Sequence, residues 1–162
     1  GNHMQTTSES HLSPEIIAQL KNNDISYYNF QNLTDQQVVD QYAHCDVLSF
    51  ASTYEGFGMP IVEANATGRP VITSNLLSMP EIAGNAACIV DPFDVDSIRQ
   101  GILKVIQDKS YREELVRNGL TNCKRFDPRS IADSYLSLYK KIAGYKMPEQ
   151  DPVARLLSSK AN

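Results

Sequence analysis

Apolar residues along the chain follow two kinds of pattern, short runs and longer stretches with helical spacing. The short runs at 25–28, 47–50, 71–73 and 87–90 predict four strands. Apolar residues recur every three or four positions over about 14–21, 34–43, 94–106, 111–124 and 128–142, which predicts helices. A short helix from Pro60 and a single turn at 79–82 are also predicted. Because strands and helices alternate, we expect an α/β fold, a Rossmann-like parallel sheet with helices on both faces.

Polar residues with short side chains mark where several of these helices begin. Ser13 and Thr34 precede the first two helices, and Asp94 and Asp127 precede two later ones. Each side chain can accept a hydrogen bond from a free amide of the first turn. On the second helix, the residues expected to face inward are Val38, Val39, Tyr42 and Ala43.

Size and composition narrow the possible functions. The 162 residues suffice for one domain at most, and the net charge of −4 argues against a nucleic-acid partner. No run of 18 apolar residues predicts a membrane helix, and no signal peptide is recognisable. Three widely spaced cysteines favour reduced thiols and a cytoplasmic setting. No metal site is predicted, because metal-ligand spacing is lacking between these cysteines and His3, His11 and His44.

The segment that carries most of the chemistry is EGFGMPIVE, which begins at Glu55 and ends at Glu63. It follows the predicted strand at 47–50, and Pro60 suits the first turn of a helix. The two glycines therefore lie in a turn between a strand and a helix, where backbone can approach a ligand closely. A helix N-terminus favours an anion, and the flanking carboxylates can accept hydrogen bonds from hydroxyl groups. The segment suits a ligand that combines phosphate with sugar.

These residues resemble the retaining glycosyltransferases of family 4, which have the GT-B architecture. The pattern E-G-F-G-x-P-x-x-E is followed by ANATGRPVI at 64–72, as in that family. The resemblance extends to LTDQQ at 33–37, AHCDV at 43–47, MPEIAGNAA at 79–87 and VDP at 90–92, and it covers about residues 25–142. It implies a domain that binds a nucleoside-diphosphate sugar and transfers the sugar with retention to an acceptor hydroxyl.

The resemblance also implies roles for individual residues. Glu55 is expected to act in catalysis by hydrogen-bonding the donor sugar, and Glu63 to accept the ribose hydroxyls. The base would lie against the loop at 30–33, where Gln31 stands in place of a common glycine of the family, so uracil, guanine and adenine stay open. The other expected donor-binding residues are Gly56, Phe57, Gly58, Met59, Pro60, Gln31 and Leu33.

The chain also departs from the family. The resemblance implies an N-terminal acceptor domain and opening strands with an Arg and a Lys against the diphosphate, and neither can be matched here. We therefore expect residues 1–10 to be tag and flexible lead-in, 11–144 a partial donor-binding domain, and 145–162 a tail of uncertain status. We expect an active parent protein, with a glycan or lipid-linked acceptor, and a fragment that is inactive alone and self-associates. The donor would bind without metal or other cofactor, in the cytoplasm or peripherally at the inner face of a membrane.

Simpler interpretations of the same residues remain open. Glu55 could be a solvated turn carboxylate, Glu63 a first-turn acid that complements the helix dipole, and Phe57 a core residue. Accordingly, the domain could be a non-catalytic module that binds a nucleotide or nucleotide sugar. It could also be a protein-interaction domain that uses an exposed helix face.

Overall fold

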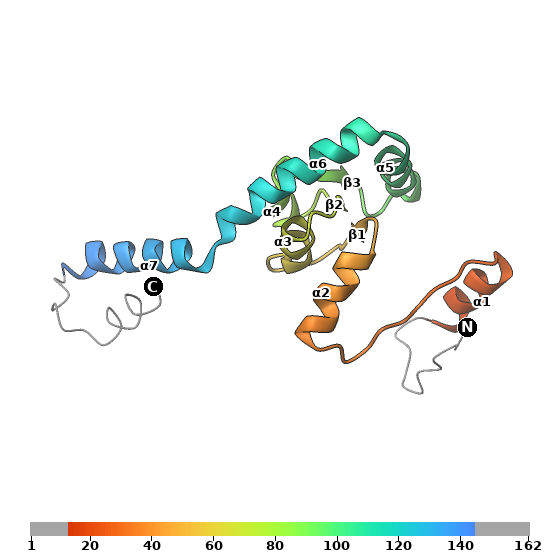
Figure 1. Ribbon diagram of the computed structural model, residues 1–162, viewed down its shortest axis with the longest axis horizontal. Coiled ribbons are helices and arrows are strands. Elements are labelled where there is room, and N and C mark those ends of the chain that lie inside the picture. The colour runs from red at the N-terminus through yellow and green to blue at the C-terminus, as the bar shows by residue number, and fades with distance from the viewer. Residues whose placement is uncertain (1–12, 145–162) are drawn as a thin grey trace. The chain divides into compact units, whose positions relative to one another are not determined.

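The computed structural model describes residues 13–144, so the predictions made for 1–10 and 145–162 lie outside the described residues. The chain forms two compact units, and the boundary between them falls after Gln41. Figure 1 colours the chain from the N-terminus to the C-terminus.

The first unit begins with α1 (Pro14–Asn22), and the Ser13 side chain accepts a hydrogen bond from the Ile16 amide at 3.3 Å, as expected of a cap. The predicted strand at 25–28 is wrong, because this segment forms no strand in the structure. Its Tyr28 is 82% exposed and stacks on Phe30, with ring centroids 6.0 Å apart. A strand needs a partner for its backbone groups, and the segment pairs with none of the three described strands.

Helix α2 (Asp35–His44) begins with a reciprocal cap. The Gln37 amide donates to Thr34 Oγ1 at 3.3 Å, and the Thr34 amide donates to Gln37 Oε1 at 2.8 Å. This confirms Thr34 as the helix start. The predicted inward face is only half correct: Val38 and Tyr42 are half-buried, whereas Val39 and Ala43 are exposed.

The second unit contains a parallel sheet of three strands in the order β1 (Leu48–Phe50), β2 (Val71–Ser74), β3 (Ala87–Val90). In register, Leu48 lies opposite Val71, which in turn lies opposite Ala87. All four residues of β2 are buried, as expected for a central strand covered on both faces. The α/β fold class is confirmed, with three strands within residues 13–144 in place of the expected four.

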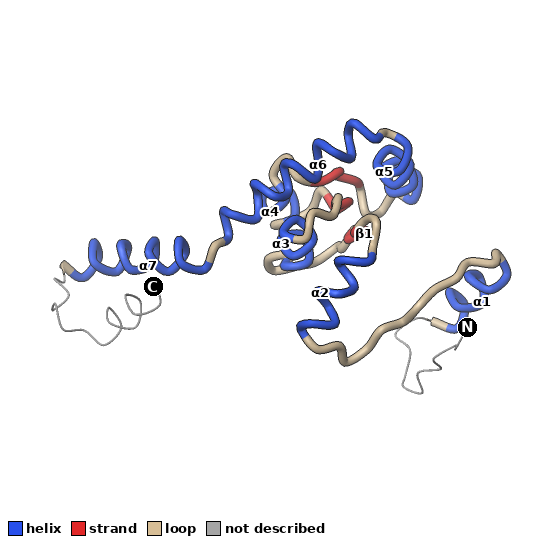
Figure 2. The backbone as a smooth tube through the Cα atoms, in the orientation of Figure 1, coloured by secondary structure: helices blue, strands red, loops and turns tan. Residues whose placement is uncertain are grey.

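Helices pack on both faces of this sheet and form two apolar clusters. On one face, α3 (Met59–Ala66) and α4 (Met79–Ala83) contribute Ile61, Met79 and Ile82. On the other, α5 (Val95–Gln107) and α6 (Lys109–Asn122) contribute Val105 and Leu115. Figures 1 and 2 show these four helices around the strands. Each such side chain, once fully buried, contributes about 1.5–3 kcal/mol.

The chain continues through a short 3₁₀ turn (Cys123–Phe126) into α7 (Pro128–Ala143). Asp127 caps α7 by accepting from the Ser130 amide at 2.9 Å, which confirms the predicted start. No residue of α7 is buried. Gly144 ends the helix in the left-handed conformation, with φ 58°.

Candidate functional site

The glycine-containing segment connects the carboxyl end of β1 to α3, as predicted. Strand β1 ends at Phe50 and α3 begins at Met59, one residue before Pro60. Gly58 is the N-cap residue and has φ 100°, a conformation that residues with a side chain rarely adopt. A Cβ at this position would lie only 3.1 Å from Met79 Sδ and 3.3 Å from Ile61 Cδ1. Glycine is therefore required here by both backbone conformation and packing.

Two serines hold the part of the turn that carries Glu55. The Ser52 hydroxyl donates to Glu55 Oε1 at 3.1 Å, and the Glu55 side chain is half-buried. From the start of α4, the Ser78 hydroxyl lies within hydrogen-bond reach of the Phe57 and Glu55 carbonyl oxygens, at 3.0 and 3.4 Å. These contacts tie the turn to a neighbouring element and orient the carboxylate, whose second oxygen accepts no hydrogen bond from the described residues.

The outer side of the turn faces solvent. Tyr54 is 83% exposed and Met59 is 54% exposed. Gly56 is also exposed, and a Cβ built on it would meet nothing within 4 Å. Phe57 is partly exposed and packs edge-on against Phe126, with ring centroids 5.5 Å apart. A ligand could therefore approach the backbone of this turn from solvent.

Glu63 lies on α3 and has a different partner from Glu55. The Tyr42 hydroxyl donates to Glu63 Oε2 at 2.9 Å. Burial, and then the hydrogen bond to the negatively charged Glu63, raise the pKa of Tyr42 well above its usual range. The raised pKa extends into more alkaline solution the range in which the phenol is a hydrogen-bond donor. Glu55 lies in the turn, and Glu63 lies in the helix that follows it.

The remaining predicted site residues are Gln31 and Leu33, which belong to the first unit. Both are half-buried and precede α2. Their expected role against the base stays a prediction. The described residues contain no cluster of His, Cys, Asp and Glu arranged to hold a metal ion.

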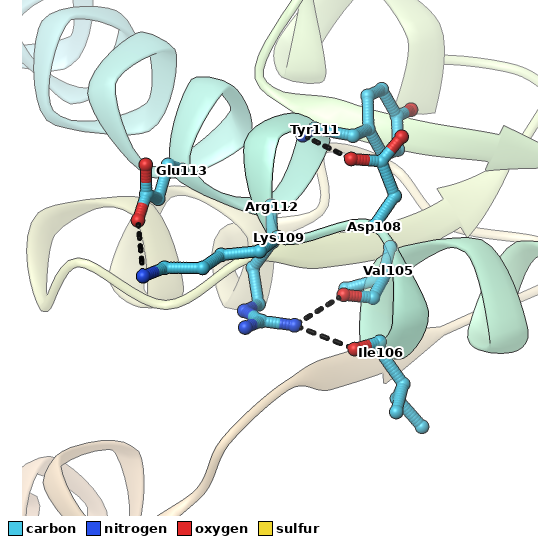
Figure 3. A network of polar contacts seen from close by, with 7 residues as sticks. All are labelled: Val105, Ile106, Asp108, Lys109, Tyr111, Arg112 and Glu113. Carbon is cyan, nitrogen blue, oxygen red and sulfur yellow. Dashed lines mark hydrogen bonds and ion pairs between the residues drawn. The ribbon is translucent and has the colours of Figure 1, made fainter.

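A hollow of about 910 Å³ lies at the opposite end of the sheet, beside the residues that lead into β1 and β2. Its lining includes Arg69 and Arg112. Arg112 donates to the carbonyl oxygens of Val105 and Ile106 at 3.0 and 2.7 Å, and so satisfies carbonyls at the end of α5 (Figure 3). Arg69 donates to the Ala43 carbonyl at 2.7 Å. Both guanidinium groups are engaged by backbone, which makes this hollow a weaker site candidate than the turn.

Three residues that support the two acids escaped the sequence analysis. The sequence pattern gives no role to Ser52 or Ser78, although the Ser78 hydroxyl contacts a turn 21 residues earlier. Tyr42 was expected only to face inward. The one available signal was its hydroxyl, because a buried tyrosine usually finds a hydrogen-bond partner.

Within residues 13–144, every helix is too short or too polar to traverse a bilayer.

Known proteins share both the fold and the sequence pattern. The chain is 40% identical over 106 residues to the O-antigen chain mannosyltransferase B of Escherichia coli; the match covers 65% of this chain but only 28% of that protein. The sucrose-phosphate synthase of Thermosynechococcus elongatus superposes with a TM-score of 0.68 at 21% identity, covering 80% of this chain and 34% of the synthase. Anabaena HepE, solved with UDP and glucose, superposes with a TM-score of 0.63 at 24% identity. The match covers 76% of this chain and 36% of HepE. These structural neighbours are GT-B glycosyltransferases.

The family match covers most of the chain, including the turn and both acids. Residues 6–121 match the family described as "Glycosyl transferases group 1". The chain therefore belongs to the group 1 glycosyltransferases.

Proposed function

We propose that this chain is the donor-binding part of a retaining glycosyltransferase of family 4, and that it binds a nucleoside-diphosphate sugar at the turn between β1 and α3. The observation that carries the proposal is the solvent-facing turn itself. It joins the carboxyl end of a parallel strand to a helix N-terminus, and it holds the half-buried carboxylate of Glu55. In open α/β sheets, ligands bind at the carboxyl ends of strands.

The turn offers complementary groups to the two ends of such a donor. The N-terminus of α3 has no side-chain cap. Pro60 has no amide hydrogen and the Ile61 amide donates to the Gly58 carbonyl at 3.0 Å, so the helix offers a diphosphate its dipole and the Met59 amide. Glu55 keeps Oε2 for a sugar hydroxyl while Ser52 holds Oε1. Glu63 would accept the ribose hydroxyls. The donor would need no metal or other cofactor, because amides and positive side chains of the whole protein would balance the leaving diphosphate.

The donor sugar is proposed to be a hexose. One relative is an O-antigen mannosyltransferase, and one structural neighbour was solved with UDP and glucose. The chain spans 28% of the length of that first relative. The acceptor, a glycan or a lipid-linked sugar, would therefore bind largely to the rest of the parent protein. We propose that the reaction takes place in the cytoplasm and that the 162-residue chain alone is inactive.

In the reaction, the bond between the anomeric carbon and the diphosphate breaks, and the acceptor hydroxyl attacks the same face of the sugar. The proton of the hydroxyl passes to an oxygen of the departing diphosphate. The negative charge that develops on the diphosphate is stabilised by preorganised donors. Glu55 orients the sugar so that its anomeric carbon faces the acceptor. It acts here through hydrogen bonds to hydroxyl groups and forms no covalent bond with the sugar.

Substitution of Glu55 in the full-length parent protein tests this function. Glu55→Gln should lower the rate of sugar transfer by about a hundredfold or more, as for other groups that stabilise a transition state by hydrogen bonding. The measurement is the initial rate with a nucleoside-diphosphate hexose. Glu81→Gln is the matched control, because Glu81 is an exposed acid on the neighbouring α4. Unchanged transfer by the Glu55 variant would remove Glu55 from the mechanism.

A further inference from the structure

The hydrogen bond between Tyr42 and Glu63 joins two helices that are separated in the chain by β1. Tyr42 lies in the last turn of α2, and Glu63 lies in the second turn of α3. Their contact, 2.9 Å between the phenol oxygen and Oε2, spans 21 residues of sequence and is partly buried. No other described side chain donates a hydrogen bond to the Glu63 carboxylate. The phenol therefore controls the orientation of this carboxylate in the structure.

This geometry leaves Oε1 of Glu63 able to accept hydrogen bonds from a ligand. A carboxylate has about four acceptor positions on its two oxygens. The Tyr42 hydroxyl occupies one position on Oε2, and Oε1 accepts no hydrogen bond from the described residues. A free glutamate side chain would sample several rotamers, and ordering it on binding would cost conformational entropy. With Tyr42 bonded to Oε2, the carboxylate is ordered before a ligand arrives.

We infer that Tyr42 is a positioning residue for ribose recognition, which holds the Glu63 carboxylate so that Oε1 receives the hydroxyls of the donor ribose. This inference rests on the ribose role of Glu63 given under the proposed function. It adds a residue of α2 that acts on the ligand only through Glu63.

Both partners support a stable contact at working pH. The Tyr42 phenol is half-buried, and its pKa is raised by burial first and by the Glu63 carboxylate second. A protonated phenol donates to a carboxylate, and such a charge-assisted hydrogen bond is stronger than one between neutral groups. The backbone of Glu63 is fixed independently, since the Thr67 amide and hydroxyl both donate to its carbonyl at 3.1 Å. Loss of the phenol hydroxyl should therefore free the carboxylate without moving the helix.

The first experiment tests the contact without any ligand. The Tyr42 ring is followed by NMR at neutral pH in the chain and in its Glu63→Gln variant. Replacing the charged acceptor by a neutral amide oxygen should shift the resonances of the Tyr42 ring, while those of Tyr111 on the other face of the sheet stay unchanged. Unchanged Tyr42 resonances would show that the contact is absent in solution and would overturn the inference.

The second experiment measures the preference for ribose. The chain is titrated with UDP and GDP and with their 2′-deoxy counterparts, and the affinity ratio of the ribo form to the deoxy form is determined. The Tyr42→Phe variant should reduce this ratio by about threefold to tenfold, the range expected when one hydrogen bond that orients a charged group is lost. Tyr111→Phe is the matched control. Tyr111 is also half-buried with a raised pKa, but it packs on the opposite face of the sheet.

The variants separate this inference from the proposed function. If Glu63→Ala keeps the ribose preference, or if the chain shows none, the ribose role of Glu63 fails and the inference fails with it. If Glu63→Ala loses the preference while Tyr42→Phe retains it, only the role of Tyr42 is overturned. Thermal unfolding of each variant is recorded by circular dichroism. If Tyr42→Phe does not fold, the NMR comparison of the chain with Glu63→Gln still tests the contact, and unchanged Tyr42 resonances still overturn the inference.

Discussion

At Gly58 the backbone adopts φ 100° and passes against Met79 and Ile61, whereas Gly56, two residues earlier, has open space where a side chain would be. The same residue type therefore has two different functions within one turn. Gly58 makes the turn possible, since a residue with a Cβ would be strained at this φ and would force Met79 and Ile61 to shift. Because Gly56 has no side chain, the backbone on the outer side of the turn stays accessible. This accessibility matters only if a ligand comes close to the backbone.

Alanine at each position should separate these two functions. We predict that Gly58→Ala lowers the free energy of unfolding by about 1–3 kcal/mol, because it adds backbone strain and a close contact with Met79. Gly56→Ala should change it by less than about 0.5 kcal/mol but should weaken nucleoside-diphosphate binding. Urea unfolding and ligand-observed NMR provide the two measurements. Equal stabilities of the two variants would contradict this account of Gly58.

The sequence predicted the turn and its two acids, but not the residues that hold the acids. The spacing of glycines, Pro60 and carboxylates within one short segment carries its own signal. The partners Ser78 and Tyr42 come from 21 residues after Phe57 and 21 residues before Glu63. Such contacts exist only once the sheet has brought α2, α3 and α4 together. A single sequence contains no local pattern for them.

Among the elements, strand prediction succeeded where a neighbouring strand was available and failed where none was. Strand β2 pairs on both sides and is fully buried. The segment at 25–28 has comparable strand propensity, yet it pairs with no described strand and exposes Tyr28. Strand propensity depends on packing and pairing more than on the backbone preference of each residue. Helix starts were easier to predict, because caps such as Ser13 and Asp127 act within one turn.

The cap of α7 predicts a pH dependence at the level of this helix. Hydrogen bonds from the Ser130 amide and hydroxyl lower the pKa of Asp127 below its ordinary value. A lowered pKa in the folded chain means that the ionised cap stabilises the helix above the ordinary pKa of Asp. That contribution is lost as pH falls through the lowered value. We therefore expect the first turn of α7 to fray in acid.

This fraying can be followed through the Ser130 amide resonance and its hydrogen exchange as pH is lowered from neutral. The matched variant is Asp127→Asn, since Asn also caps helices well but does not titrate in this range. In that variant the acid-dependent change at Ser130 should disappear while α7 still begins at the same residue. If both chains fray alike in acid, Asp127 is not the group responsible.

Across the whole molecule, two features present surfaces suited to self-association. The first is a stripe on α7 formed by Ile131, Tyr135, Leu138 and Ile142, all of them exposed. Their spacings of four, three and four residues place them along one side of the helix, as in the contact face of paired helices. The second is β1, which is an edge strand of the described sheet and has unpaired backbone groups on one side.

We predict that the chain associates with itself through the α7 stripe, so that its average mass by sedimentation rises between micromolar and millimolar concentrations. Burying apolar side chains from two copies provides the driving force, at about 25 cal/mol per Å² of apolar surface. Leu138→Glu places a charge in the stripe and should shift the association to higher concentration. Lys140→Gln alters the net charge by the same amount on the opposite side of α7 and should leave it unchanged.

The outcomes of this experiment separate the two surfaces. Association that persists in Leu138→Glu would point to the β1 edge, where pairing depends on backbone groups and is insensitive to a charge on α7. A monomer at every concentration would exclude both surfaces as interfaces between copies of the chain.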